Sequence, residues 1–141
     1  MSSLPLLLLA AIAVLFVPAS AVVKDGKLIG WAQSAASSGQ IFCNGKAEKG
    51  VKVKLFDHDH LDPDDKMGET VADTQGNFQV AGKTTSISTI LPEVHIKFDC
   101  GHLLRKCYKY KIPSTYVTKG ASPSKVFPAG RIELSSVKPN C

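Results

Sequence analysis

The chain has 141 residues, with 17 Lys and Arg against 12 Asp and Glu, a formal net charge of +5, and 44% hydrophobic residues. This length predicts a single domain that is large enough to bury a hydrophobic core. The excess of Lys favours acidic partners such as anionic lipid, sulfated glycan or an acidic protein, but it is too modest and too dispersed to indicate nucleic-acid binding.

The N-terminus predicts a secretory signal peptide at residues 1–21. The apolar run Leu4–Val17 is interrupted only by Pro5 and is too short to span a bilayer comfortably. The A-x-A pattern that ends at Ala21 predicts cleavage after this residue. A membrane anchor is the alternative, because the first residues lack Lys and Arg. No second long apolar run follows, so we expect a secreted, extracellular protein without a transmembrane segment.

The rest of the chain predicts a flexible leader at residues 22–38 and a domain at residues 39–141 with about seven short strands. The segment GVKVKLFD at Gly50–Asp57 alternates apolar and polar residues, as half-buried strands do. A turn at Thr74-Gln75-Gly76 predicts a tight hairpin between residues 69–73 and 77–80, with Gly76 supplying a positive φ. The other predicted strands are Gln40–Cys43, Glu93–Asp99, Cys107–Ile112 and Gly130–Val137.

The predicted fold class is all-β. No segment shows a strong apolar period of 3.6 over ten residues, and a short helical turn within Pro113–Lys119 is the only helical expectation. Gly82–Leu91 is rich in Ser and Thr and predicts a loop. Short alternating strands separated by turns favour a two-sheet antiparallel sandwich with Greek-key connections.

Four cysteines in a secreted domain of this size predict two disulfides, for which three connectivities exist. Cys100 and Cys107 end two neighbouring predicted strands where these meet their shared loop. This position favours a Cys100–Cys107 bond and leaves Cys43 to pair with Cys141. No two cysteines have the C-x₂₋₄-C spacing, so a cysteine-based zinc site is not expected.

Six motifs follow one another between Gly39 and Leu134: GQIFC at 39–43, GVKVKLFD at 50–57, ADTQGNFQVAG at 72–82, PEVHIKFDC at 92–100, CYKYKIP at 107–113 and GRIEL at 130–134. Their order resembles the nematode transthyretin-like family. The resemblance implies a secreted transthyretin-like (prealbumin-like) Greek-key β-sandwich in which the first strand lies parallel to the last. In such a fold, Cys43 and Cys141 would both lie at C-terminal strand ends, in agreement with the favoured pairing.

The resemblance also implies a function. Among nematode relatives the theme is extracellular bridging, including recognition of phosphatidylserine exposed on dying cells, which implies lipid binding, a cell-surface receptor and a role in apoptotic cell clearance. The similar hydrolases carry a C-terminal Tyr-Arg-Gly-Ser signature, whereas this chain ends Val137-Lys138-Pro139-Asn140-Cys141. Hydrolase activity is therefore not carried over. The alternative function is an extracellular carrier of a small apolar ligand in a transthyretin-like groove or channel.

Outward-facing cations form the first candidate site, an anion-binding face. In the family fold the strands that contain them are neighbours, with cross-strand side chains roughly 5 Å apart. Clustered cations attract phosphate and sulfate groups. A solvated face is the alternative, because exposed lysines on strands also prevent aggregation. The face consists of Lys52, Lys54, His95, Lys97, Lys109 and Lys111, with Arg105 and Lys106 at the hairpin end.

The Asp-rich segment DHDHLDPDD at Asp57–Asp65 is a second, weaker candidate. Loop carboxylates can hold Ca²⁺, and His58 and His60 are potential ligands of Zn²⁺. The EF-hand spacing is absent, and Asp and Pro form turns without any ion, so we expect no cofactor and keep calcium as the alternative. The candidate metal ligands are Asp57, Asp59, Asp62 and Asp64.

No catalytic motif is present. The chain lacks G-x-S-x-G, H-E-x-x-H and a paired catalytic-carboxylate motif. His95 lies on an outward strand face and is explained as a solvated residue, and His102 is a loop residue beside the favoured Cys100–Cys107 disulfide. The sequence therefore predicts a non-enzymatic binding protein.

Overall fold

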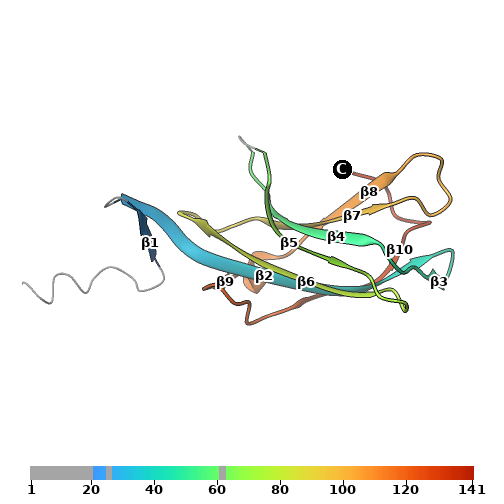
Figure 1. Cartoon of the computed structure of the whole chain (residues 1–141), viewed down its shortest axis with the longest axis horizontal. Helices are drawn as coiled ribbons and strands as arrows, with labels where there is room; N and C mark the ends of the chain where they lie inside the picture. Colours follow the sequence, from blue (N-terminus) through green and yellow to red (C-terminus); the bar gives the residue numbers. More distant parts are fainter. Residues whose placement is uncertain (1–20, 25–26, 61–62) are drawn as a thin grey trace, which may run out of the picture.

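A computed structural model describes residues 21–24, 27–60 and 63–141 of the chain. Residues 1–20, which include nearly all of the predicted signal peptide, lie outside the described residues. In the described part, two β-sheets lie one over the other (Figure 1). The strands are β1 (Ala21–Lys24), β2 (Lys27–Cys43), β3 (Lys46–Ala47), β4 (Lys52–Asp57), β5 (Asp65–Val71), β6 (Asn77–Ser86), β7 (Pro92–Phe98), β8 (Lys106–Lys111), β9 (Thr118–Lys119) and β10 (Phe127–Glu133).

The predicted all-β sandwich is confirmed. In the six-stranded sheet, β2 pairs with β1, β3, β6, β9 and β10, and the four-stranded sheet has the order β5-β4-β7-β8. β2 runs parallel to β10, as the family resemblance implied, whereas its other pairings are antiparallel. A 3₁₀ turn at Ser114–Tyr116 lies within the predicted helical turn. Among the described residues there is no helix of the length and apolarity needed to cross a bilayer.

The long strand β2 replaces most of the predicted flexible leader. β2 pairs with β6 from Trp31 opposite Ser86 to Gln40 opposite Asn77. Small residues of the predicted leader are buried in this strand, with Ser34 and Ala35 both at 0% exposure. Because small side chains allow close packing, tertiary contacts override the weak strand propensity of this segment. The predicted Ser/Thr-rich loop is shortened for the same reason, since β6 continues to Ser86.

The predicted hairpin around Gly76 is also corrected. β5 pairs with β4 and β6 pairs with β2, so the turn joins strands of different sheets. The turn itself is tight and has the predicted positive φ at Gly76, which is 77°. The Gly76 N–H donates to the Asp73 carbonyl at 3.0 Å. The Asp73 carboxylate accepts the N–H groups of Gln75 and Asn77, both at 2.9 Å, which stabilises the turn.

The core lies between the sheets, where alternate residues of each strand point inward. Two hydrogen bonds also cross the core. Ser37 in β2 donates its hydroxyl proton to the Phe127 carbonyl at 2.9 Å. Because that proton is used, the hydroxyl of Tyr110 in β8 is the donor to Ser37, at 2.7 Å. Burial raises the pKa of Tyr110, which keeps this donor protonated. The largest fully buried apolar side chains are Ile41, Val53, Leu55, Val80, Ile90, Val94, Ile96 and Leu134.

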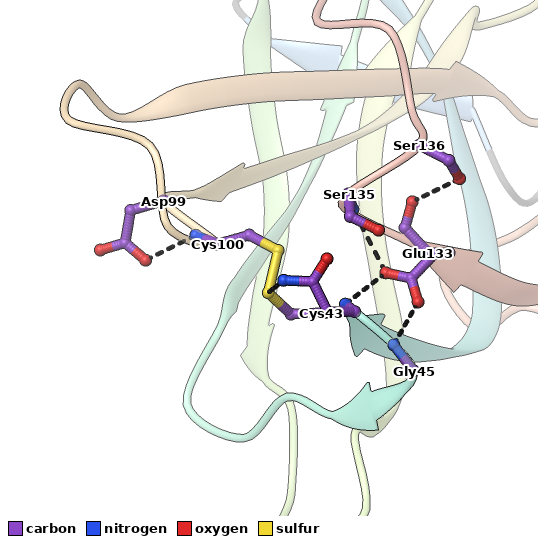
Figure 2. The surroundings of a disulfide bond; sticks show 8 residues. Cys43, Gly45, Asp99, Cys100, Glu133, Ser135 and Ser136 are labelled. Carbon is purple, nitrogen blue, oxygen red and sulfur yellow. Dashed lines mark hydrogen bonds between the residues drawn. A yellow bond between two sulfur atoms is a disulfide. The ribbon is translucent and has the colours of Figure 1, made fainter.

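All four cysteines form disulfides, but the favoured pairing was wrong. The bonds are Cys43–Cys100 and Cys107–Cys141. Cys107 lies opposite Lys97 in the β7–β8 ladder and therefore faces outward, whereas Cys100 follows Phe98 by two residues and packs against the core. The two cysteines lie on opposite faces of one hairpin and cannot bond. Figure 2 shows that Cys100 instead reaches Cys43 at the end of β2, so this disulfide joins the two sheets.

The C-terminal tail folds back along the edge strand β8. The Asn140 side chain accepts the Lys109 N–H at 2.7 Å and donates to the Lys109 carbonyl at 3.0 Å. The Asn140 N–H also donates to the Cys107 carbonyl at 3.0 Å. The Cys107–Cys141 disulfide fixes the tail there, so the backbone groups of this edge are partly covered.

Glu133 closes the turn beside the Cys43–Cys100 disulfide (Figure 2). Its carboxylate accepts the N–H groups of Gly45 at 2.6 Å, Asn44 at 2.9 Å and Ser135 at 3.2 Å. Desolvation alone would raise the pKa of Glu133, but these donors outweigh it and the pKa lies below its usual value. The ionised form is therefore stabilised by folding.

We expect Glu133→Gln to lower the free energy of unfolding at neutral pH. A carboxyl group with a lowered folded-state pKa stabilises the fold above its unfolded pKa, near 4.5, and this contribution disappears as the pH falls through the folded-state pKa. Urea unfolding between about pH 3 and pH 7 should therefore show a difference from the wild type that shrinks below about pH 4.5. Glu48→Gln is the control, and a pH-independent difference for Glu133→Gln would contradict the assignment.

Candidate functional site

The outer face of the four-stranded sheet carries all six predicted anion-binding residues. β4, β7 and β8 are neighbours, and their register places Lys52 opposite Lys97, Lys54 opposite His95, and His95 opposite Lys109. Lys111 lies at the other end of the face, opposite Glu93. The alternation in the sequence therefore predicted correctly which side chains share this surface.

A groove of about 400 Å³ opens where β4 begins and β7 ends. We call it the cationic groove, because five Lys and Arg side chains line it against two acidic ones. Lys52 and Lys97 are exposed and directly opposite each other. Such an arrangement concentrates positive potential at one end of the sheet. The charged lining residues are Lys49, Lys52, Lys54, Lys97, Arg105, Glu48 and Asp99.

At the other end of the face, the carboxylate of Glu93 compensates the positive charge. Glu93 is only 2% exposed, and its Oε2 lies 3.3 Å from His95 Nε2 and 3.7 Å from Lys109 Nζ. Glu93 shares the parity of His95 and Lys97 in β7, so it belongs to the same face. The six predicted residues therefore do not form one uniform site, and the excess positive charge lies in the cationic groove.

The edge strand β5 adds a second acidic group to this face. Glu69 lies opposite Lys54 in the β4–β5 ladder and is 3.0 Å from Lys66. A hydrogen bond and the charge of Lys66, followed by the charges of Lys54 and Lys52, lower the pKa of Glu69. The positive charge of Lys54 is thus partly compensated by Glu69. Lys52 and Lys97 remain as an exposed pair that lies directly opposite across β4 and β7.

Two leucines at the tip of the β7–β8 hairpin were missed by the sequence reasoning. Leu103 and Leu104 have relative exposures of 104% and 74%, the highest among the exposed large hydrophobic residues of the described chain. Figure 1 shows their loop projecting from the end of the sandwich that lies away from β1. We call this pair the leucine tip. Adjacent leucines between Gly101 and Arg105 were the available signal, because loops seldom need exposed apolar side chains.

Cations continue from the groove around the leucine tip. A second groove, of about 340 Å³, shares Lys97 and Arg105 with the first and is also lined by Lys106. Arg105 and Lys106 directly follow the leucines in sequence. An apolar tip with adjacent cations therefore occupies this end of the molecule.

The predicted calcium ligands have different environments. Asp57 accepts the Leu91 N–H at 2.9 Å, and burial, opposed by this hydrogen bond, raises its pKa. Asp64 accepts the Asp59 N–H at 3.1 Å and lies 3.0 Å from His58 Nδ1. Asp62 lies outside the described residues. Among the described residues, the possible metal-binding group in this region consists of His58, Asp64 and Glu93.

The comparisons with known proteins establish the family. A family profile described as the transthyretin-like family matches residues 38–113. The chain belongs to the transthyretin-like family. Transthyretin-like protein 2 of Caenorhabditis elegans is 38% identical over 79% of this chain and 81% of its own length. Transthyretin-like protein 5 of that organism is 35% identical over 84% of this chain and 88% of its own length, and transthyretin-like protein 1 is 34% identical over 90% and 88%.

Membership of the transthyretin-like family supports a secreted binding protein. Among solved structures, a 9R-lipoxygenase from Cyanothece aligns with 97% of this chain and 21% of its own, at 16% identity and a TM-score of 0.43. Similarity at this level carries no argument about function. The ligand of this transthyretin-like protein therefore follows from the chemistry of its own side chains.

Proposed function

We propose that this protein is a non-enzymatic extracellular bridging protein that binds anionic membrane surfaces, such as exposed phosphatidylserine on dying cells. The end of the sandwich with the cationic groove contacts the lipid. The remaining surface is free to engage a second partner such as a cell-surface receptor, so that the protein links the two.

The cationic groove is the observation that carries the proposal. Lys52 and Lys97 face each other across two neighbouring strands, and Arg105 lines the same groove. Each Lys or Arg held near an anionic bilayer contributes about 1 kcal/mol of attraction. Charged side chains of this kind favour a phosphate or carboxylate head group over the small apolar ligand of a carrier.

The leucine tip supports a membrane rather than a soluble anion. Exposed apolar side chains are unfavourable in water and gain free energy when they enter the acyl region of a bilayer. Arg105 and Lys106 directly follow the leucines in sequence. When the leucines enter the acyl region, these two cations therefore lie at the level of the lipid head groups. A phosphate ion or a free glycan offers no place for these side chains.

Vesicle binding tests the proposal. We expect the oxidised protein to sediment with phosphatidylserine-containing vesicles more than with phosphatidylcholine vesicles, and salt should weaken this binding. Lys52→Glu/Lys97→Glu should lower the affinity by about 30-fold or more, because two attractive charges become repulsive. Leu103→Ser/Leu104→Ser should lower binding at every salt concentration, since it removes apolar contact without changing charge.

Lys83→Glu/Lys119→Glu is the matched control. It makes the same change in net charge on strands β6 and β9 of the other sheet and should alter the affinity by less than about threefold. Vesicles with phosphatidylglycerol in place of phosphatidylserine separate recognition of charge from recognition of the serine head group. Equal losses for the groove and control variants, or equal binding to neutral vesicles, would refute the proposal.

A further inference from the structure

A buried acidic residue lies beneath the Asp-rich segment, at the end of the sheet away from the cationic groove. Glu93 points to the outer face of the four-stranded sheet, yet only 2% of it is exposed. His58 lies against it, with its Nδ1 3.5 Å from Glu93 Oε1 and 3.0 Å from Asp64 Oδ1. One imidazole nitrogen thus faces two carboxylates from different elements.

The two oxygens of Glu93 have different partners. Oε2 lies 3.3 Å from His95 Nε2 and 3.7 Å from Lys109 Nζ. The 3.5 Å between Oε1 and His58 Nδ1 exceeds the roughly 2.7–2.9 Å of a charge-assisted hydrogen bond. A buried, negatively charged oxygen needs a hydrogen-bond donor or a positive charge in close contact. Because His58 Nδ1 is too distant from Oε1 for a short hydrogen bond, we infer that a cation can bind there.

The spacing of the three side chains suits a small divalent ion. Their ligand atoms all lie within 4.8 Å of one another. Bonds of about 2.1 Å in a tetrahedral zinc site place ligand atoms roughly 3.4 Å apart. The separations of 3.0 Å and 3.5 Å from His58 Nδ1 lie on either side of this value.

We propose that His58, Asp64 and Glu93 bind one zinc ion through Nδ1 and two carboxylate oxygens. One nitrogen and two oxygens suit zinc better than calcium, which takes six to eight oxygen ligands. His95 and Lys109 hold the other oxygen of Glu93 and orient its carboxylate, as partners of metal ligands commonly do. The site differs from the predicted calcium set, with which it shares only Asp64.

The fourth coordination position of the zinc is open. A small pocket of about 90 Å³ adjoins the site, with His58, His60, Glu93, Lys111 and Ser114 in its lining. This space has room for a water molecule and polar groups that can bind it. Three protein ligands and an exchangeable water form an open zinc site rather than a closed structural one.

Metal titration of the oxidised protein, freed of metal with a chelator, tests the site. We expect one zinc ion per chain in competition with a chromogenic chelator, and a visible Co²⁺ absorption spectrum typical of tetrahedral coordination. Zinc at a hundredfold its dissociation constant should raise the melting temperature by roughly 10 °C. His58→Ala and Asp64→Asn should each weaken binding by about 100-fold or more, and His95→Ala by about tenfold.

His102→Ala is the matched control, because this histidine lies in the exposed β7–β8 loop, and it should leave zinc affinity unchanged. Reductant must be absent, since His95 also lies near Cys107 and Cys141, whose thiols would bind zinc if the disulfide opened. Melting of each variant without metal establishes that it is folded. The absence of saturable 1:1 binding, or binding that survives both His58→Ala and Asp64→Asn, would overturn the proposal.

Discussion

Replacing Cys43 and Cys100 together by alanine should lower the free energy of unfolding by about 4 kcal/mol. The disulfide closes a segment of 57 residues, and the chain-entropy model assigns about this amount to a loop of that length. The bond also joins the end of β2 to the residues that follow β7, so its loss removes a cross-link between the two sheets. Urea unfolding of the variant and wild type measures the difference.

Cys107→Ala/Cys141→Ala is the matched comparison. Its loop of 34 residues gives a similar entropic value of about 4 kcal/mol, but this bond ties down only the tail. The native tail can detach when the bond is lost, so we expect a smaller net destabilisation and faster hydrogen exchange at the Lys109 amide. Equal destabilisation with unchanged exchange would contradict this distinction.

Peptide mapping without reduction checks the connectivity independently. Trypsin cleaves after Arg105 and Lys106, which separates Cys100 from Cys107. The structure requires a linked peptide containing Cys43 and Cys100, and a linked peptide containing Cys100 and Cys107 would be incompatible with it.

Gly68→Ala and Gly82→Ala should each lower the free energy of unfolding by about 3 kcal/mol. Gly68 in β5 and Gly82 in β6 lie where the two sheets approach each other at one side of the sandwich. A Cβ at Gly68 would collide with the Ala81 carbonyl oxygen, and a Cβ at Gly82 with the Met67 carbonyl oxygen. Both obstacles are backbone atoms, so the strands must separate. Thermal and urea unfolding measure the loss.

The double variant gives a sharper test of this contact. Once one methyl group has separated β5 from β6, the second should cost less, and the combined loss should fall short of the sum by at least about 1 kcal/mol. Gly50→Ala is the control, because its Cβ would meet nothing within 4 Å and only its φ of 79° opposes alanine. We expect about 1 kcal/mol there. Strict additivity at Gly68 and Gly82 would contradict a shared contact.

Alternation along the strands predicted much of the fold. Val94, Ile96 and Phe98 are buried as expected, and Lys52 and Lys97 face outward together. The same parity already placed Cys100 inward and Cys107 outward, so it excluded their bond. Proximity to a shared loop was the weaker criterion, because strand register decides which side chains can meet.

Other features depended on contacts that a single sequence does not reveal. Ser34 and Ala35 belong to β2 because β6 pairs with this strand over a long ladder, although their composition is typical of a flexible leader. The burial of Glu93 requires the Asp-rich segment to fold over the sheet, which strand periodicity cannot predict. The candidate zinc site combines residues from that segment and from β7. Its ligands are far apart in the sequence, so they do not form a recognisable metal-binding motif.

The folded-back tail also limits how the four-stranded sheet can grow. An uncovered edge strand can accept a strand from another molecule, and repeated addition leads to polymers. Here Asn140 occupies both backbone groups of Lys109, and the Cys107–Cys141 bond prevents its departure. At this edge the tail therefore blocks the addition of another strand, and it does so for as long as the disulfide stays oxidised. The bond that contributes to folding stability thus also acts as a stop against self-association through β8.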